Sequence, residues 1–142
     1  MLSRAASRFR GLAPLPLRVV MGLAFMVHGY PKIVHLGVTA HNFAQRGFVP
    51  GLFWGPLVAV VEAVGGLCLI VGLLTRYWSA AIAIEMVVTT LVVKVPRGAR
   101  FVAIGGQGSG YELDLIYLAV ALALVVLGGG FLSADQTLLG EE

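Results

Sequence analysis

GPLVAVVEAVGGLCLIVGLL, residues 55–74, is the stretch of sequence that decides the fold. Its only charged side chain is Glu62. A helix rises about 1.5 Å per residue and the hydrocarbon core of a bilayer is about 30 Å thick, so about 20 apolar residues are enough to cross it. The stretch therefore predicts a membrane-spanning helix.

Three further stretches have the same character, at about residues 14–34, 77–95 and 112–131. The second of these contains Glu85, and the third is uncharged after Asp114. The sequence therefore predicts an all-α fold, a transmembrane four-helix bundle.

The composition of the chain supports a surface in contact with lipid. Hydrophobic residues make up 58% of the 142 residues and charged residues 12%, whereas soluble domains carry about 25% charged residues. So little charge leaves too little polar surface to keep a folded chain of this size in water. The length favours one membrane domain over residues 1–142.

The segments between the predicted helices differ in character. Residues 35–54 mix aromatic and polar side chains, which is typical of a segment at the membrane interface with Trp54 at headgroup level. Residues 75–78 predict a tight turn that makes the second and third helices antiparallel neighbours. The third connection, residues 96–111, contains GGQGSG. It predicts a flexible loop, because a phosphate-binding loop needs a Lys-Ser/Thr ending.

Three arginines, Arg4, Arg8 and Arg10, precede the first apolar stretch. They favour contact with anionic headgroups over nucleic-acid binding, which we do not expect. The stretch that follows contains His28 and Lys32 and has no small-residue cleavage site, so we interpret it as a retained helix and not as a signal peptide. An organelle transit peptide is an open alternative.

The positive charges also bear on orientation. With the N-terminus inside, the inner segments hold the three N-terminal arginines and Arg76, and the outer segments hold Arg46, Arg97 and Arg100. The excess predicts that both termini are cytoplasmic. The membrane is expected to be a bacterial plasma membrane.

Ionisable side chains within the spans are costly, at about 2.5 to 3.5 kcal/mol each near the middle of a helix. On the first helix Arg18 and Lys32 share a stripe about 80° wide with two glycines, and His28 lies at its edge. Glycine lets a second backbone approach closely, so such faces are expected to meet protein. The glycines expected to pack helices in this way are Gly22, Gly29, Gly65, Gly66 and Gly128.

The alternating direction of the helices predicts which charges meet. We expect a polar cluster in the outer half of the bundle and an ion pair between Arg18 and Asp135 at the inner end. Glu85 has no expected partner. The members of the predicted cluster are His28, Lys32, Glu62, Glu112 and Asp114.

Two interpretations of these charges are open. They are structural pairs that fix helix order, or they line a partly hydrated pocket that binds a small polar or quinone-like ligand or relays protons. The three histidines are too scattered for a metal site, and Cys68 is expected to pack in an apolar run. No covalently bound cofactor is expected.

Three motifs together resemble the DoxX family of small membrane proteins. The first helix has the pattern R-x3-G-x5-HG-x2-K from Arg18 to Lys32, and the second has E-x2-GG-x5-G-L-x-T-R from Glu62 to Arg76. The end has GYE at residues 110–112 and then GGG-F-L-S-A-D up to Asp135. The resemblance covers about residues 12–138. An S-L-D-like ending is more usual in the family than the S-A-D found here.

The resemblance implies a four-helix membrane fold and an association with redox systems. One branch of the family resembles the membrane subunit of a thiosulfate:quinone oxidoreductase, and others are linked to oxidative-stress complexes. Glu85 is not a position associated with the family. The positions that the resemblance marks as characteristic are Arg18, His28, Gly29, Lys32, Glu62, Gly66, Glu112 and Asp135.

Two functions are consistent with these observations. The first is an accessory membrane subunit of a redox system, quinone- or thiosulfate-linked or involved in oxidative stress, which acts with a membrane or soluble partner. The second is a non-enzymatic membrane scaffold or a small permease. Because four helices enclose little room for a transport path, a permease would have to form a homo-oligomer.

Overall fold

The computed structural model describes residues 9–103 and 110–140. Within them helix is the only regular secondary structure, so the predicted all-α fold class is confirmed. Arg4, Arg8 and residues 105–109 of GGQGSG lie outside the described residues. The elements are η1 (Arg10–Leu12), α2 (Pro14–Val34), α3 (Leu36–Gln45), α4 (Gly51–Val71), α5 (Thr75–Val88), η2 (Thr89–Lys94), η3 (Val95–Arg97), α6 (Glu112–Leu127) and η4 (Asp135–Leu139).

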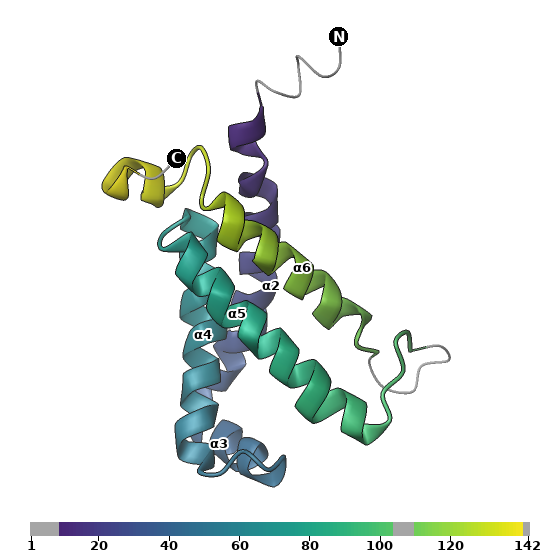
Figure 1. Cartoon of the computed structure of the whole chain (residues 1–142). Coiled ribbons are helices and arrows are strands. Elements are labelled where there is room, and N and C mark those ends of the chain that lie inside the picture. Colours follow the sequence, from purple (N-terminus) through teal and green to yellow (C-terminus); the bar gives the residue numbers. More distant parts are fainter. Residues whose placement is uncertain (1–8, 104–109, 141–142) are drawn as a thin grey trace.

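The long helices alternate in direction and form two pairs. Helix α2 packs along α4, and α5 packs along α6, with the second pair inclined to the first (Figure 1). We call the end that holds Arg10, the α4–α5 turn and the C-terminal segment the terminal end. We call the opposite end, with α3, η3 and the start of α6, the loop end.

Glycines bring α2 and α4 into direct contact. A Cβ atom added to Gly22 would lie 2.5 Å from the carbonyl oxygen of Gly66, and one added to Gly29 would lie 2.3 Å from the backbone nitrogen of Ala63. A Cβ on Gly65 would lie 2.7 Å from the ring of Trp78 on α5. Small residues at these positions therefore set the distance between the helices.

Large side chains fill the space beside these contacts. The buried core takes residues from all four long helices, and its largest apolar members are Met21, Phe25, Leu69, Ile82, Met86 and Leu124.

The turn between α4 and α5 lies earlier than predicted. Gly72 has a φ of 71° and ends α4, and the N–H of Leu73 donates to the carbonyl of Cys68 at 2.8 Å. Thr75–Trp78, predicted as the turn, form the first turn of α5. The carboxylate of Asp135 accepts hydrogen bonds there from the N–H groups of Leu74 (2.5 Å) and Thr75 (2.9 Å).

Three other helix ends differ from the predicted ones. Helix α4 begins at Gly51 and not at residue 55, because the extended Pro50 precedes it directly. Helix α6 ends at Leu127 and not at residue 131, because Gly128 has a φ of 72°. The rod formed by α5, η2 and η3 continues past residue 95 to Arg97.

The segment predicted to lie at the interface contains a helix, α3, which packs against the start of α4. A Cβ atom on Gly55 would lie 2.9 Å from the Cα of Ala40, and Gly51 is close to the carbonyl oxygen of the same residue. This close approach holds the loop end of the α2–α4 pair together.

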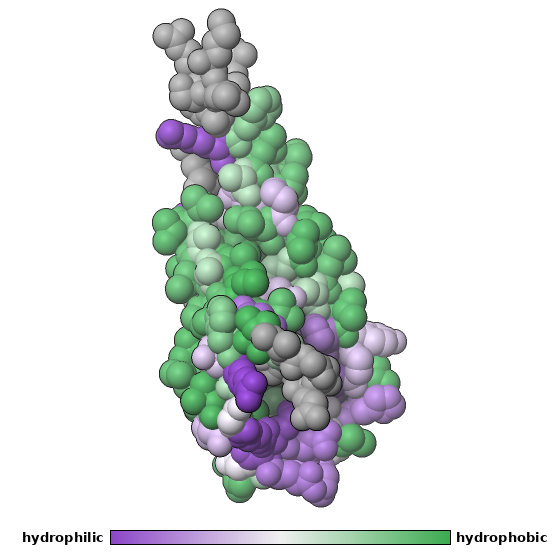
Figure 2. Space-filling model, turned by 90° about the vertical axis from the view of Figure 1, so that its right-hand side faces the viewer, coloured by the Kyte–Doolittle hydropathy of each residue, from purple (hydrophilic) through white to green (hydrophobic). Residues whose placement is uncertain are grey.

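Three helices are long and apolar enough to cross a membrane: Arg10–Val34, Gly51–Val71 and Thr75–Arg97. Helix α6 has 16 residues, or about 24 Å, and is shorter than the other three. Apolar side chains point outward, including Val27 (65% exposed) and Val126 (74%). Figure 2 shows apolar surface along the body and polar surface gathered toward the loop end. The protein is a transmembrane four-helix bundle.

Candidate functional site

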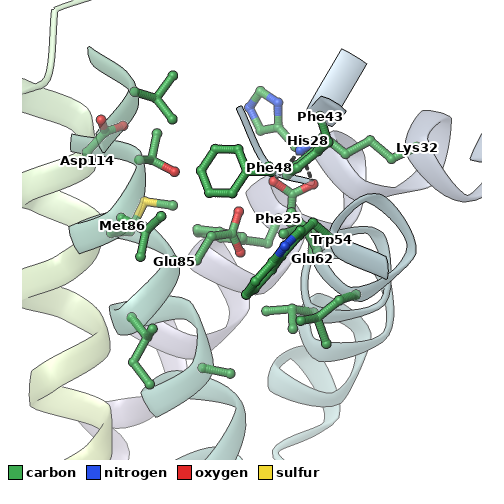
Figure 3. Close-up of a pocket in the computed structure, with 18 of the residues that line it drawn as sticks. Phe25, His28, Lys32, Phe43, Phe48, Trp54, Glu62, Glu85, Met86 and Asp114 are labelled. Atoms are coloured by element: carbon green, nitrogen blue, oxygen red, sulfur yellow. Dashed lines mark hydrogen bonds and ion pairs between the residues drawn. The ribbon is translucent and has the colours of Figure 1, made fainter. Parts of the chain in front are cut away.

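A pocket of about 340 Å³ lies toward the loop end, between both helix pairs and the segment after α3. Its size is within the range of small-molecule sites in proteins. Figure 3 shows side chains from several helices that point into it. The lining residues with polar, charged or aromatic side chains are Phe25, His28, Lys32, Phe43, Arg46, Phe48, Trp54, Glu62, Glu85, Thr89, Asp114 and Tyr117.

Lys32 and Glu62 form an ion pair across the α2–α4 contact. The Nζ atom of Lys32 donates to Oε1 of Glu62 at 2.5 Å, and Glu62 is only 5% exposed. Helical side chains point back toward the N-terminus, so Lys32, near the end of α2, reaches inward to the level of Glu62. The pair places one positive and one negative charge on one wall of the pocket.

Glu62 lies deeper than predicted. The predicted helix, residues 55–74, makes Glu62 its eighth residue, but α4 begins at Gly51, about 16 Å before Glu62 along the helix axis. Glu62 is therefore close to the middle of this span.

Glu85, for which the sequence predicted no partner, lines the same pocket from α5. Its carboxyl group interacts with that of Glu62, and both point into the cavity in Figure 3. A signal for this pairing is present in the sequence. Glu62 precedes Gly72 by 10 residues and Glu85 follows Leu74 by 11, so the two arms of one helical hairpin bring them to the same depth.

Asp114 lines the pocket from α6 but pairs with a different lysine. It accepts a hydrogen bond from Lys94 at 2.9 Å and one from the hydroxyl of Thr90 at 3.4 Å. Lys94 also donates to the carbonyl of Gly110 at 3.0 Å. The second ion pair therefore ties the α5–η2 rod to α6, as the first ties α2 to α4.

The predicted cluster divides in the structure. His28, Lys32, Glu62 and Asp114 line the pocket, whereas Glu112 does not. Positions 112 and 114 are about 200° apart on a helix, so the two acids cannot share a face. His28 is exposed and lies at the pocket wall beside Lys32.

An aromatic wall was not predicted. Phe48 contacts Phe43 with ring centroids 5.7 Å apart and Trp54 at 6.1 Å. Elsewhere in the lining Phe25 meets Tyr117 edge to face at 5.3 Å. The sequence predicted only that Trp54 and the phenylalanines of residues 35–54 lie at headgroup level. The rings of Phe43, Phe48 and Trp54 face the pocket because α3 folds back onto α4. A contact between two separate segments cannot be predicted from the local sequence pattern.

Arg18 and Asp135 both lie at the terminal end and are each 1% exposed, but they do not form the predicted ion pair. Arg18 donates to the carbonyls of Leu69 (3.3 Å), Ile70 (2.5 Å) and Leu132 (2.5 Å), and Asp135 accepts from the start of α5. They interact electrostatically at longer range. The free carbonyls that end α4 and the free N–H groups that begin α5 lie nearer than the opposite charge and bind each side chain first.

The pocket combines an apolar, aromatic body with a few charged groups. Such a site suits a ring-shaped, mostly apolar ligand that carries a small number of hydrogen-bond acceptors. Among residues 9–103 and 110–140, no group of three His, Cys, Asp or Glu side chains is placed to hold a metal ion.

Comparison with known proteins agrees with this architecture. The family model DoxX matches residues 13–95. A Bacillus subtilis protein named "Putative oxidoreductase CatD" is 29% identical over 87% of this chain and 85% of its own length. An uncharacterized protein of Haemophilus influenzae is 31% identical over 84% of this chain and 86% of its own length. No solved structure matches the chain significantly.

The family model covers more than half of the chain, including α2, α4 and the whole α5–η2 rod that carry most of the pocket. The chain belongs to the DoxX family.

Proposed function

We propose that this protein is an accessory membrane subunit of a redox system and that its pocket binds a quinone head group. The observation that carries the proposal is the pocket itself, where an aromatic wall meets the ion pair of the partly exposed Lys32 with Glu62, which is buried near the middle of its span. A quinone is a flat ring that packs against aromatic side chains, and its carbonyl oxygens accept hydrogen bonds from groups such as Lys32 and His28.

The electrons would come from a partner protein. The chain has a single cysteine and no CxxC motif, and none of its helices carries histidines paired at haem-ligand spacing. An electron-carrying partner, in the membrane or soluble, is therefore part of the proposal. The name of the Bacillus subtilis relative, which describes an oxidoreductase, supports a redox setting.

We further propose a bacterial plasma membrane with both termini in the cytoplasm. The even number of long helices supports a common side for the two termini, and the described chain begins and ends at the terminal end (Figure 1). Arg10 and Arg76 lie at this end, which agrees with the preference of cytoplasmic segments for positive charge.

Quinone binding is tested by titrating the detergent-purified protein with a short-chain quinone and following tryptophan fluorescence. We expect saturable quenching that is lost in Trp54→Phe, because Trp54 lines the pocket, and kept in Trp78→Phe, because Trp78 packs against Gly65 outside it. Lys32→Ala should raise the Kd at least about tenfold, which corresponds to about 1.4 kcal/mol. An affinity unchanged in both Lys32→Ala and Glu62→Gln would refute the proposal.

A scaffold or small permease is the second candidate. The observation in its favour is that each ion pair, Lys32–Glu62 and Lys94–Asp114, joins two neighbouring helices, as a purely structural pair would. This function predicts that Lys32→Met and Glu62→Gln reduce the abundance of folded protein in the membrane. Variants that remain fully folded and abundant but lose quinone binding would favour the redox function.

A further inference from the structure

The carboxyl groups of Glu62 and Glu85 face each other across the pocket from two different helices. Each interacts with the other, and the Oε2 atom of Glu85 is buried with no hydrogen-bond donor among the described residues. Oε2 of Glu62 contacts Lys32 but also lacks a donor in hydrogen-bonding geometry. Two ionised carboxylates only accept hydrogen bonds, so neither of these groups can satisfy the other unless one of them carries a proton.

The charges around the pair do not balance without that proton. Lys32 forms an ion pair with Glu62, and Lys94 forms an ion pair with Asp114. From the other elements His28 on α2, Arg46 after α3 and Tyr117 on α6 also face the pocket. His28 and Arg46 are exposed at the surface of the bundle, however, so among the described residues Glu85 is the pocket acid left without an ion-pair partner.

A lone carboxylate at this depth is unfavourable. Glu85 is the eleventh residue of the 23-residue span Thr75–Arg97, and so lies at the middle of the membrane. An unpaired ionised group there is unfavourable, and a neighbouring carboxylate adds repulsion. A single proton shared by the two acids removes both costs.

We propose that Glu62 and Glu85 hold one proton between them, and that this carboxyl pair is the proton donor that the pocket presents to its ligand. The donor role rests on the proposed function, because it takes the ligand to be a carbonyl-bearing ring such as a quinone. The Glu85 carboxyl points into the cavity (Figure 3), where its O–H can bind a ligand carbonyl oxygen. The protonation itself does not depend on any ligand.

Infrared spectroscopy of the full chain in lipid nanodiscs tests the shared proton. A protonated carboxylic acid has a C=O stretch well separated from that of a carboxylate, and the band shifts in D2O. We expect this band at neutral pH in the wild type and a clear loss of intensity in Glu85→Gln. Asp114→Asn is the matched control, because Asp114 is ion-paired with Lys94 and should contribute no such band.

The outcomes separate the two claims. A wild type without the band, or a Glu85→Gln variant whose spectrum is unchanged, would overturn the shared proton. If the band is present and adding a quinone shifts its position, the donor role is supported. If the band is present and a quinone that quenches Trp54 leaves it unmoved, the donor role is wrong. If the quinone does not bind at all, the proposed function is wrong, but the proposal of a shared proton is unaffected.

The shared proton can also be tested on the wild-type protein alone, so that the result does not depend on whether a variant folds. Membrane-soluble carbodiimides react with protonated carboxyl groups in apolar surroundings, and peptide mapping by mass spectrometry locates the adduct. We expect the adduct on Glu62 or Glu85 and none on Asp114 or Asp135, which accept hydrogen bonds from cations or backbone N–H groups. Adducts spread equally over all four acids would contradict the proposal.

Discussion

Replacement of Gly29 by alanine is expected to abolish the native packing of α2 on α4. The added Cβ atom would lie 2.3 Å from the backbone nitrogen of Ala63 and 2.7 Å from the Cβ of Glu62. Both atoms belong to a rigid helix, so the clash is relieved only if the helices separate. Overpacking of a well-packed core typically costs about 1 to 3 kcal/mol, and we expect the upper end or beyond because a backbone must move.

The effect of Gly29→Ala is measured as the shift in the unfolding midpoint in detergent titrated with sodium dodecyl sulfate. Gly37→Ala is the matched control, because a Cβ atom at Gly37 in α3 meets nothing within 4 Å. That variant should be unchanged or slightly more stable, since alanine favours helix over glycine by about 1 kcal/mol. Equal stability of the two variants would mean that α2 and α4 do not touch at Gly29.

Gly29→Ala is also expected to weaken the pocket, because the same contact positions Glu62. Gly29 packs against the first carbon of the Glu62 side chain, and Lys32 lies one helical turn further along α2. Separation of the helices would lengthen the Lys32–Glu62 pair. Quinone affinity and stability are therefore expected to fall together in this variant, whereas Lys32→Ala lowers the affinity with a smaller loss of stability.

The sequence predicted which faces of the helices meet protein but not how deep each group lies. Gly22 and Gly29 lie against α4, as the stripe on the first helix indicated, because helical periodicity is a local property. The depth of Glu62 was wrong because residues 51–54 were assigned to the interfacial segment, although α4 begins at Gly51. Pro50-Gly51 was the available signal for that start, since proline commonly marks the beginning of a helix.

The partner of Glu85 and the aromatic wall illustrate two different limits. The pairing of Glu85 with Glu62 follows from counting residues on both sides of the α4–α5 turn, but the prediction placed the turn three residues too late, at Thr75 in place of Gly72. The contact of Phe48 with Trp54 has no comparable local signal. It depends on the path of the chain from α3 into α4, which is set by the tight fit of Ala40 against Gly51 and Gly55.

The terminal end shows why oppositely charged residues brought to one level need not pair. Arg18 and Asp135 are both buried there, as expected from their positions near helix ends. A helix end leaves its last carbonyls and first N–H groups without partners within the helix. The α4–α5 turn presents both free carbonyls and free N–H groups. The arginine therefore binds the carbonyls, and the aspartate binds the N–H groups.

Replacement of Arg18 by methionine is therefore expected to destabilise the terminal end strongly. The guanidinium group joins α2 to the last carbonyls of α4 and to Leu132 in the C-terminal segment. Its loss deprives those carbonyls of their donor and removes a cation that interacts with the buried Asp135. Loss of one partner of a buried charge typically costs about 3 to 5 kcal/mol, and we expect a change in unfolding free energy of that order.

Arg18→Lys separates the charge from the hydrogen-bonding geometry. Lysine keeps the positive charge near Asp135, but its single ammonium group cannot span carbonyls that arginine reaches with two nitrogens. We expect a stability between those of the wild type and Arg18→Met. Arg10→Met, at an exposed position at the very start of the first span, is the control and should leave the unfolding midpoint unchanged. If Arg18→Met matched that control, the three carbonyl contacts would contribute nothing to stability, and the C-terminal segment would be held at this end by Asp135 and the backbone alone.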